Sequence, residues 1–118
     1  MDERDPPAGV TSRKAIPATA RVPFGTLPWE PVVEGARQKT TVRGNKRIRL
    51  LELTDSFVEH DWCVKQHAGS VLEGDLEIMF ETHVERLGPG DGLLIESDEK
   101  HKARALTTRA LLLLVEEL

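Results

Sequence analysis

Short stretches of alternating apolar and polar residues follow one another along most of this chain of 118 residues. In residues 76–80, three large apolar side chains alternate with a glutamate and a methionine, which is typical of a strand with one buried face. Residues 46–54 repeat the pattern, with Ile48 on one face and Arg47 and Arg49 on the other. Further extended stretches are predicted at residues 37–42, 57–66, 70–72, 93–96, 101–106 and 109–115.

Turn signals separate these stretches. Residues 73–75 (Glu-Gly-Asp) predict a tight turn and residues 88–92 a glycine-rich one, while residues 81–86 are expected to be a polar connection. Residues 109–115 lack polar alternation, which indicates a strand covered on both faces, and residues 116–118 could form one last helical turn. Eight or more short strands without a convincing helix predict an all-β, antiparallel architecture, either closed or made of two sheets.

The N-terminal part of the chain has a different character. Residues 1–20 are rich in Pro, Ala, Thr and charge without an apolar period, so we expect a flexible arm. From Arg21 to Pro31, three prolines space out four large apolar side chains, which predicts an extended segment along an apolar surface or a sheet edge, with Trp29 as its anchor. A chain of this length buries one core, so residues 21–118 are expected to be a single domain.

The composition, with 39% hydrophobic and 31% charged residues, is that of an ordinary soluble globular protein. The longest apolar run, residues 110–115, is too short to cross a bilayer, and the charged N-terminus does not resemble a secretory signal. The single cysteine, Cys63, excludes an intramolecular disulfide and fits a reducing compartment. A cytoplasmic protein without a membrane span is therefore predicted.

Charge is distributed unevenly between the two halves of the chain. Residues 1–49 contain 10 Lys and Arg against 5 Asp and Glu, a net charge of +5, whereas residues 50–118 contain 6 against 15, a net charge of −9. We expect the halves to attract each other, within one subunit or between two. The basic residues between 37 and 49 have no aromatic side chains among them on which bases could stack, so nucleic-acid binding is not predicted.

The most specific pattern lies in the middle of the chain, where residues 62–67 lead into residues 71–78, and residues 88–95 are followed by His101. This succession of strand, tight turn, strand, glycine turn, strand and histidine resembles the two signature segments of the cupin superfamily. Small cupins are jelly-roll β-barrels, also described as antiparallel double-stranded β-helices. The resemblance implies that fold for this chain.

The resemblance also implies positions for metal ligands. When the first signature is aligned on Gly74, His67 takes the position of the cupin glutamate, and Asp61 and Cys63 take those of the two histidines. A gap longer by one residue would instead bring His60 into this pair. Asp61, Cys63 and His67 have the same parity, so a strand through them would point all three side chains into the barrel.

The second signature places its histidine at His101. The ligand set implied by both signatures is Cys63, His67, His101 and Asp61. A thiolate, two imidazoles and a carboxylate suit one divalent ion, either zinc, iron or nickel. His60 and Arg49 are the other candidates for the ligand pocket. The alternation around Arg49 favours a solvated face, and the alternative is that it lines the barrel and binds a carboxylate or phosphate.

Two functional hypotheses of different classes follow from the resemblance. In the first, the barrel holds a metal ion and a small molecule of unassigned identity, and metal-assisted chemistry on a small polar molecule, such as dioxygenation or isomerisation, is implied. In the second, the barrel is a metal-free binding or sensor module that captures a small ligand without converting it. The pattern does not decide whether the protein is an enzyme. A homodimer is also expected, with the basic, proline-spaced residues 21–49 against an acidic neighbouring subunit.

Overall fold

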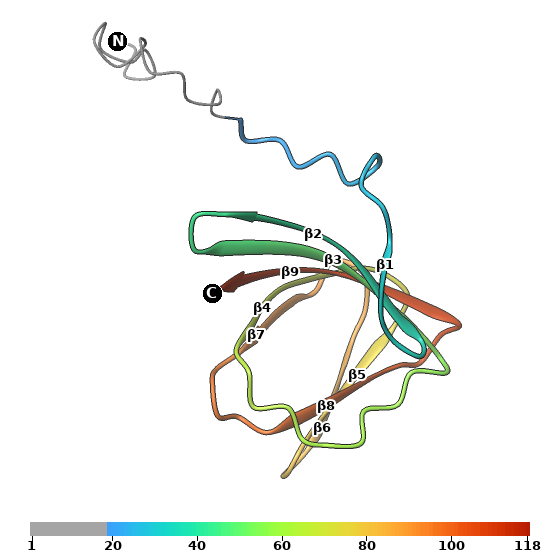
Figure 1. The fold of residues 1–118 in the computed structure, drawn as a ribbon. Helices are drawn as coiled ribbons and strands as arrows, with labels where there is room; N and C mark the ends of the chain where they lie inside the picture. Colours follow the sequence, from blue (N-terminus) through green and yellow to red (C-terminus); the bar gives the residue numbers. More distant parts are fainter. Residues whose placement is uncertain (1–18) are drawn as a thin grey trace, which may run out of the picture.

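The computed structural model describes residues 19–118, and these residues form nine strands and no helix (Figure 1). In chain order the strands are β1 (Glu30–Val33), β2 (Ala36–Arg43), β3 (Lys46–Thr54), β4 (His67–Glu73), β5 (Leu76–Phe80), β6 (Val84–Leu87), β7 (Gly92–Ile95), β8 (His101–Ala105) and β9 (Arg109–Glu117). All of their pairings are antiparallel. The predicted all-β, antiparallel class is confirmed.

The strands form two sheets that face each other (Figure 1). The larger sheet has the order β1-β2-β3-β9-β4-β7 and the smaller one the order β6-β5-β8. After β4 the chain crosses to the smaller sheet, and it changes sheets again after β6, β7 and β8. Because sequential strands are divided between facing sheets in this way, the arrangement is a jelly roll, as the resemblance implied.

The space between the sheets holds the hydrophobic core. Its most deeply buried large side chains are Val71, Leu76 and Ile95, which come from β4, β5 and β7. Leu112 and Leu114 of β9 join them from the larger sheet. Burial of each such side chain contributes about 1.5–3 kcal/mol, so the inner faces of both sheets supply the main stabilisation.

Two glycines are required by the backbone around β4. Gly74 follows the last residue of this strand with φ at 75°, a left-handed conformation that suits glycine, and a Cβ there would meet the carbonyl oxygen of Arg109. Gly69 lies within β4, where a Cβ would collide with the carbonyl group of Leu113 in the adjacent β9. The close approach of β4 and β9 therefore depends on the missing side chain at position 69.

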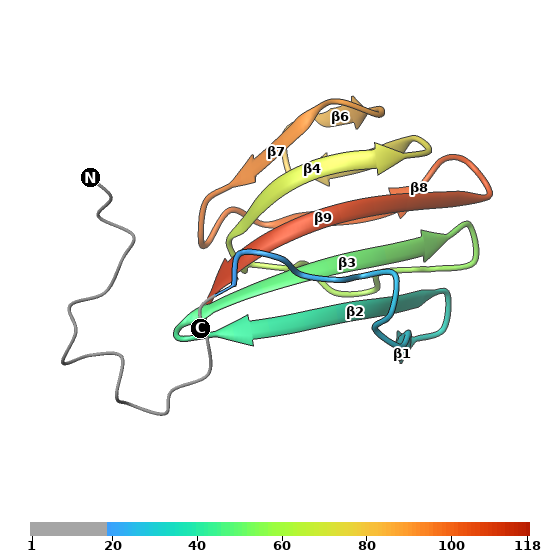
Figure 2. The same cartoon turned by 90° about the horizontal axis from the view of Figure 1, so that it is seen from above.

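Residues 19–29 form an irregular segment, with a turn at residues 24–26, over the outer face of the larger sheet (Figures 1 and 2). The Arg43 guanidinium donates hydrogen bonds to two carbonyl groups near the start of the segment, and the Lys39 ammonium donates one to the carbonyl of Phe24 at 2.7 Å. The Lys39 ammonium also lies 4.9 Å from the centre of the Trp29 ring. The segment therefore lies on a sheet face and contacts its basic side chains, where an apolar surface or a sheet edge was expected, and the half-buried Trp29 is held by the cations of Arg37 and Lys39.

Three local predictions were wrong. Residues 81–86 are not a polar connection throughout, because β6 begins at Val84 and pairs with β5. The chain end is not helical, because pairing with β3 extends β9 as far as Glu117. Residues 57–66 contain no strand and keep only an isolated bridge between Cys63 and His101.

The predicted arm, residues 1–20, lies almost wholly outside the described residues. Within residues 19–118 there is no helix of the length and apolar character needed to cross a membrane.

Candidate functional site

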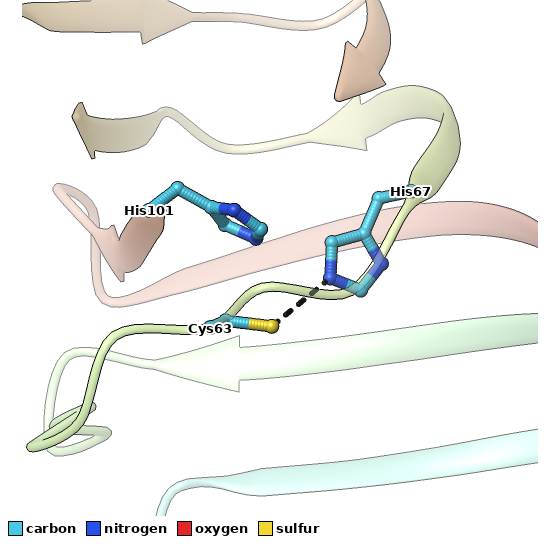
Figure 3. A group of neighbouring side chains, drawn as sticks. All are labelled: Cys63, His67 and His101. Atoms are coloured by element: carbon cyan, nitrogen blue, oxygen red, sulfur yellow. Dashed lines mark hydrogen bonds between the residues drawn. The ribbon is translucent and has the colours of Figure 1, made fainter. Parts of the chain in front are cut away.

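Three of the predicted ligands converge between the two sheets, namely Cys63, His67 and His101 (Figure 3). Their potential ligand atoms all lie within 4.8 Å of one another. The Sγ atom of Cys63 is 3.6 Å from Nε2 of His67, and the two imidazole rings meet edge to face with centres 5.1 Å apart. His101 is buried and the other two residues are half-buried, so the group is shielded but accessible.

Backbone hydrogen bonds fix Cys63 against His101. The amide of Cys63 donates to the carbonyl of His101 at 2.8 Å, and the amide of His101 donates back to the carbonyl of Cys63 at 3.0 Å. The His101 ring is oriented by the carbonyl of Glu99, which lies 2.8 Å from Nδ1. Since a carbonyl can only accept, Nδ1 carries the proton and the lone pair is left on Nε2, the tautomer needed by a metal ligand.

His67 is the first residue of β4, and its two ring nitrogens face different groups. Nε2 points to Cys63, while Nδ1 is 3.7 Å from a carboxylate oxygen of Glu116 on β9, slightly longer than a hydrogen bond. Burial lowers the pKa of His67, and the nearby His101 lowers it further. A neutral imidazole is therefore favoured, which keeps a nitrogen lone pair available for an ion.

The distances within the group can be compared with those of a tetrahedral metal site. Zinc–sulfur and zinc–nitrogen bonds of about 2.3 and 2.0–2.1 Å imply a sulfur–nitrogen separation of about 3.6 Å. Cys63 and His67 are already at this separation. The donor set therefore fits a borderline-soft divalent ion, with a modest movement of His101 to complete it and a fourth position free.

These side chains line part of a cavity of about 310 Å³ between the sheets. The remaining walls are mainly aliphatic and aromatic, with charged side chains at few positions. The apolar lining is formed by Val32, Ala36, Leu51, Leu53, Phe57, Leu76, Ile78, Leu93, Ile95, Ala103, Leu112 and Leu114. The charged lining consists of Arg49, Glu59 and Lys65. The cavity thus combines an apolar interior with one cluster of metal-ligating side chains.

Two predicted site residues lie apart from this group. Asp61 and His60 are exposed, and neither belongs to the cluster of potential metal ligands among the described residues. The prediction for Asp61 assumed a continuous strand from residue 61 to residue 67. The chain is not a strand there, so side chains do not alternate and equal parity does not place Asp61 beside Cys63.

Arg49 faces inward, so the favoured interpretation as part of a solvated face was wrong. Its side chain is 14% exposed and lines the cavity. Its guanidinium donates to Glu116 at 2.7 Å and to the side-chain oxygen of Gln38 at 3.0 Å. The carboxylate that Arg49 binds is therefore supplied by the chain itself.

The sequence reasoning missed Glu116 and Glu59. Glu116 faces Arg47, Arg49 and His67 from β9, and residue 116 had been assigned to a possible helical turn. Glu59 lies in the cavity wall and accepts a hydrogen bond from the amide of Ala103 at 2.8 Å. The opposite charges of residues 46–49 and 116–117 were a signal for pairing of these two strands.

Comparison with known proteins relates the chain to cupins through its structure. No protein-family model matches the sequence, and no curated protein matches it significantly. The structure of KdgF from Halomonas sp. is similar, with a TM-score of 0.63 and 22% identity, over 75% of this chain and 83% of that one. A cupin-2 domain protein from Shewanella frigidimarina gives a TM-score of 0.58 and 21% identity, over 69% and 79% of the two chains.

The Fe(II) form of HppE is a third similar structure, with a TM-score of 0.66 and 17% identity, over 83% of this chain and 59% of that one. At these identities the likeness concerns the fold. Together with the strand order described above, it confirms that this chain has the jelly-roll fold of the cupins.

Proposed function

We propose that this protein binds a small molecule in its jelly-roll cavity next to one divalent metal ion held by Cys63, His67 and His101. The observation that carries the proposal is the convergence of a thiol and two imidazoles within 4.8 Å, at the wall of an otherwise apolar cavity. Three protein ligands leave one tetrahedral position for water or for a polar group of the ligand. A bound ion would supply Lewis-acid chemistry to that group.

The thiolate and imidazole donors favour zinc, with iron and nickel as the other candidates. Glu116 is suited to support such a site, because its carboxylate faces the ring nitrogen of His67 that would not bind the ion. Contacts of this kind orient a histidine ligand and increase its basicity. The carbonyl of Glu99 likewise holds the proton on Nδ1 of His101, so Nε2 is the nitrogen that would bind the ion.

The walls of the cavity suggest the class of ligand. A volume of about 310 Å³ has room for roughly ten non-hydrogen atoms if each takes the volume of a water molecule. Because most lining residues are aliphatic, the favoured ligand has an apolar body and a single polar head that reaches the Cys63 end. The sequence had suggested a small polar molecule.

The metal is tested by elemental analysis of protein purified after growth in medium supplemented with zinc, iron and nickel. We expect close to one ion per chain in the wild type and a large loss in both Cys63→Ser and His101→Ala. His83→Ala is the matched control, because His83 is exposed, contacts Phe80, Thr82 and Glu85, and does not belong to the cluster of potential ligands among the described residues. Less than about a tenth of an ion per wild-type chain would reject the metal site, given the affinities of structural zinc sites.

A metal-free binding module is the second candidate. It is favoured by the Cys63–His67 contact itself, since 3.6 Å is also suitable for a hydrogen bond between sulfur and nitrogen. Thermal shifts with butyrate, hexanoate and octanoate, each measured with and without zinc, separate the two candidates. If the longer chains stabilise the apo protein as much as the zinc-loaded protein, the metal-free module is correct.

Succinate is the control ligand, because it has a carboxylate head but no apolar body. A shift that is equal for succinate and hexanoate would overturn the proposed ligand class, while the metal content would still be judged by the elemental analysis.

A further inference from the structure

The cavity wall contains a lysine to which the proposed function gives no role. Lys65 lies between Cys63 and His67 in the irregular segment that leads into β4, and its side chain lines the cavity. The same side chain lines a second hollow of about 510 Å³, which adjoins the end of β9 and the start of β4. Because Lys65 borders both spaces, it lies where the cavity and the outer hollow meet.

Positive charge prevails at this end of the cavity. The carboxylate of Glu116 is shared by Arg47 and Arg49, at 2.6 and 2.7 Å. Lys65 borders the same hollow as Arg47 and Glu116, and it has no carboxylate partner in the part of the chain that the structure describes. Three cations around one carboxylate leave an excess of positive charge at the mouth of the cavity.

A metal ion in the proposed site would add to this excess. A divalent ion bound by one thiolate and two neutral imidazoles keeps a single net positive charge. Lys65 is two residues from Cys63 and two from His67 along the chain, so its ammonium and the ion act on the same region. An anionic head group would be attracted by both charges, with the ion or without it, whereas a neutral head group would balance neither.

One carboxylate in the cavity wall has the opposite charge. Glu59 accepts a hydrogen bond from the amide of Ala103 at 2.8 Å, and it is the one acidic side chain of the lining among the described residues, against two basic ones. Ala103 follows His101 by two residues on β8, a rise of about 7 Å. Glu59 therefore lies further along the strand from the potential metal ligands, and the head-group end of the cavity remains positive.

We propose that Lys65 selects a monocarboxylate as the ligand of this cavity, by pairing with its carboxylate at the mouth while the apolar body lies between the sheets. The inference rests on the proposed function, which gives the ligand a polar head of unspecified charge. Arg49 is not this receptor, because Glu116 already binds its guanidinium. Lys65 is exposed and its stem is flexible, so its ammonium can reach a head group at the mouth.

The test compares three ligands that share one apolar body and differ in the charge of the head, namely hexanoate, hexanamide and hexylamine. Their dissociation constants are measured by calorimetry at neutral pH, with and without zinc, so that the contribution of the ion is separated. We expect the wild type to bind hexanoate at least about tenfold more tightly than hexanamide. Lys65→Met, which keeps the apolar stem, should weaken hexanoate about three- to tenfold and leave hexanamide unchanged.

Lys100→Met is the matched control, since it removes the same charge from an exposed lysine that lines neither hollow and lies 4.0 Å from Glu81. It should bind all three ligands as the wild type does. Added salt provides a readout that a structural role of Lys65 would not change. It should weaken hexanoate binding more in the wild type than in Lys65→Met, because salt screens the ammonium.

The inference is overturned if the wild type binds hexanoate and hexanamide equally, or hexylamine most tightly. It is also overturned if Lys65→Met affects hexanoate no more than Lys100→Met does. In each of these cases the cavity still binds a ligand, so the proposed function stands. If none of the three ligands binds, this inference and the proposed cavity ligand fail together, while the elemental analysis judges the metal independently.

Discussion

The ion pairs of Glu116 test how the charged side chains on the inner face of the larger sheet are stabilised. This carboxylate accepts hydrogen bonds from Arg47 and Arg49, and the exposed fractions of the Glu116 and Arg49 side chains are only 10% and 14%. Burial raises the pKa of Glu116, but the two guanidinium groups lower it by more, so the pKa falls below its usual value of 4.5. Glu116 is therefore ionised at neutral pH and balances two cations at the inner face of the sheet.

Glu116→Gln removes the charge while keeping the shape of the side chain. Arg47 and Arg49 then lose their shared anion and face each other as like charges on β3. Hydrogen bonds to charged groups contribute about 1.5–3 kcal/mol each, and breaking a buried pair costs about 3–5 kcal/mol. Because Arg47 is one-third exposed, we expect a loss below that of a fully buried pair, about 2–4 kcal/mol in the free energy of unfolding.

Urea denaturation followed by circular dichroism measures this loss, with Glu117→Gln as the control. Glu117 is the next residue on β9 and pairs with Lys46 at 3.2 Å, but the two side chains are 65% and 58% exposed. Exposed pairs contribute less than about 1 kcal/mol, so the control should be nearly neutral. If the midpoint of Glu116→Gln moves no further than that of Glu117→Gln at unchanged slope, the assignment of Glu116 as a buried counter-ion is refuted.

Three further predictions follow from particular contacts. Glu116→Gln should also weaken zinc binding about 10–100-fold, because the carboxylate that faces His67 is lost. Equal zinc affinity of the mutant and the wild type in titrations would contradict this. Gly69→Ala should destabilise the fold by about 3 kcal/mol or more, because its Cβ meets the β9 backbone, whereas Gly25→Ala has nothing within 4 Å and should melt like the wild type. The pKa of Glu52 is lowered mainly by the hydrogen bond from Arg37, against an opposing effect of burial and with help from Arg109. The contribution of Glu52 to the free energy of unfolding is therefore present above pH 4.5 and is lost as pH falls through the lowered pKa. Glu52→Gln should therefore flatten the acid side of the melting-temperature profile, and parallel profiles for mutant and wild type would exclude this role.

Much of the fold was predictable because its determinants are local. The alternation in residues 76–80 and the tight turn at Gly74 depend on neighbours in sequence, and both are present as β5 and the turn before it. The prediction for residues 81–86 was wrong for a related reason. Val84, Glu85 and Arg86 are all exposed, so β6 has almost no buried face, and its pairing with β5 rather than an apolar period makes it a strand.

The candidate site was less predictable because it depends on contacts between distant segments. Cys63 has no strand to fix its direction, and its position comes from the backbone bridge to His101, 38 residues further along the chain. Counting residues from Cys63 back to Asp61 therefore carried no information about where the Asp61 side chain points. His101 was easier to predict, since it begins a regular strand, β8, and its position matches the histidine of the second cupin signature.

The direction of Arg49 was misjudged because an arginine on a strand usually marks the solvent side, and here it marks the interior. What reverses the rule is the register of β3 and β9, which sets Arg47 opposite Glu116 and Arg49 opposite Leu114. A slip of β3 by one residue relative to β9 would turn Arg47 and Arg49 to the outer face and leave Glu116 on the inner face. The inward cations and their carboxylate would lose their partners, so this polar cluster favours the observed register, and with it the orientation of the cavity wall beside His67.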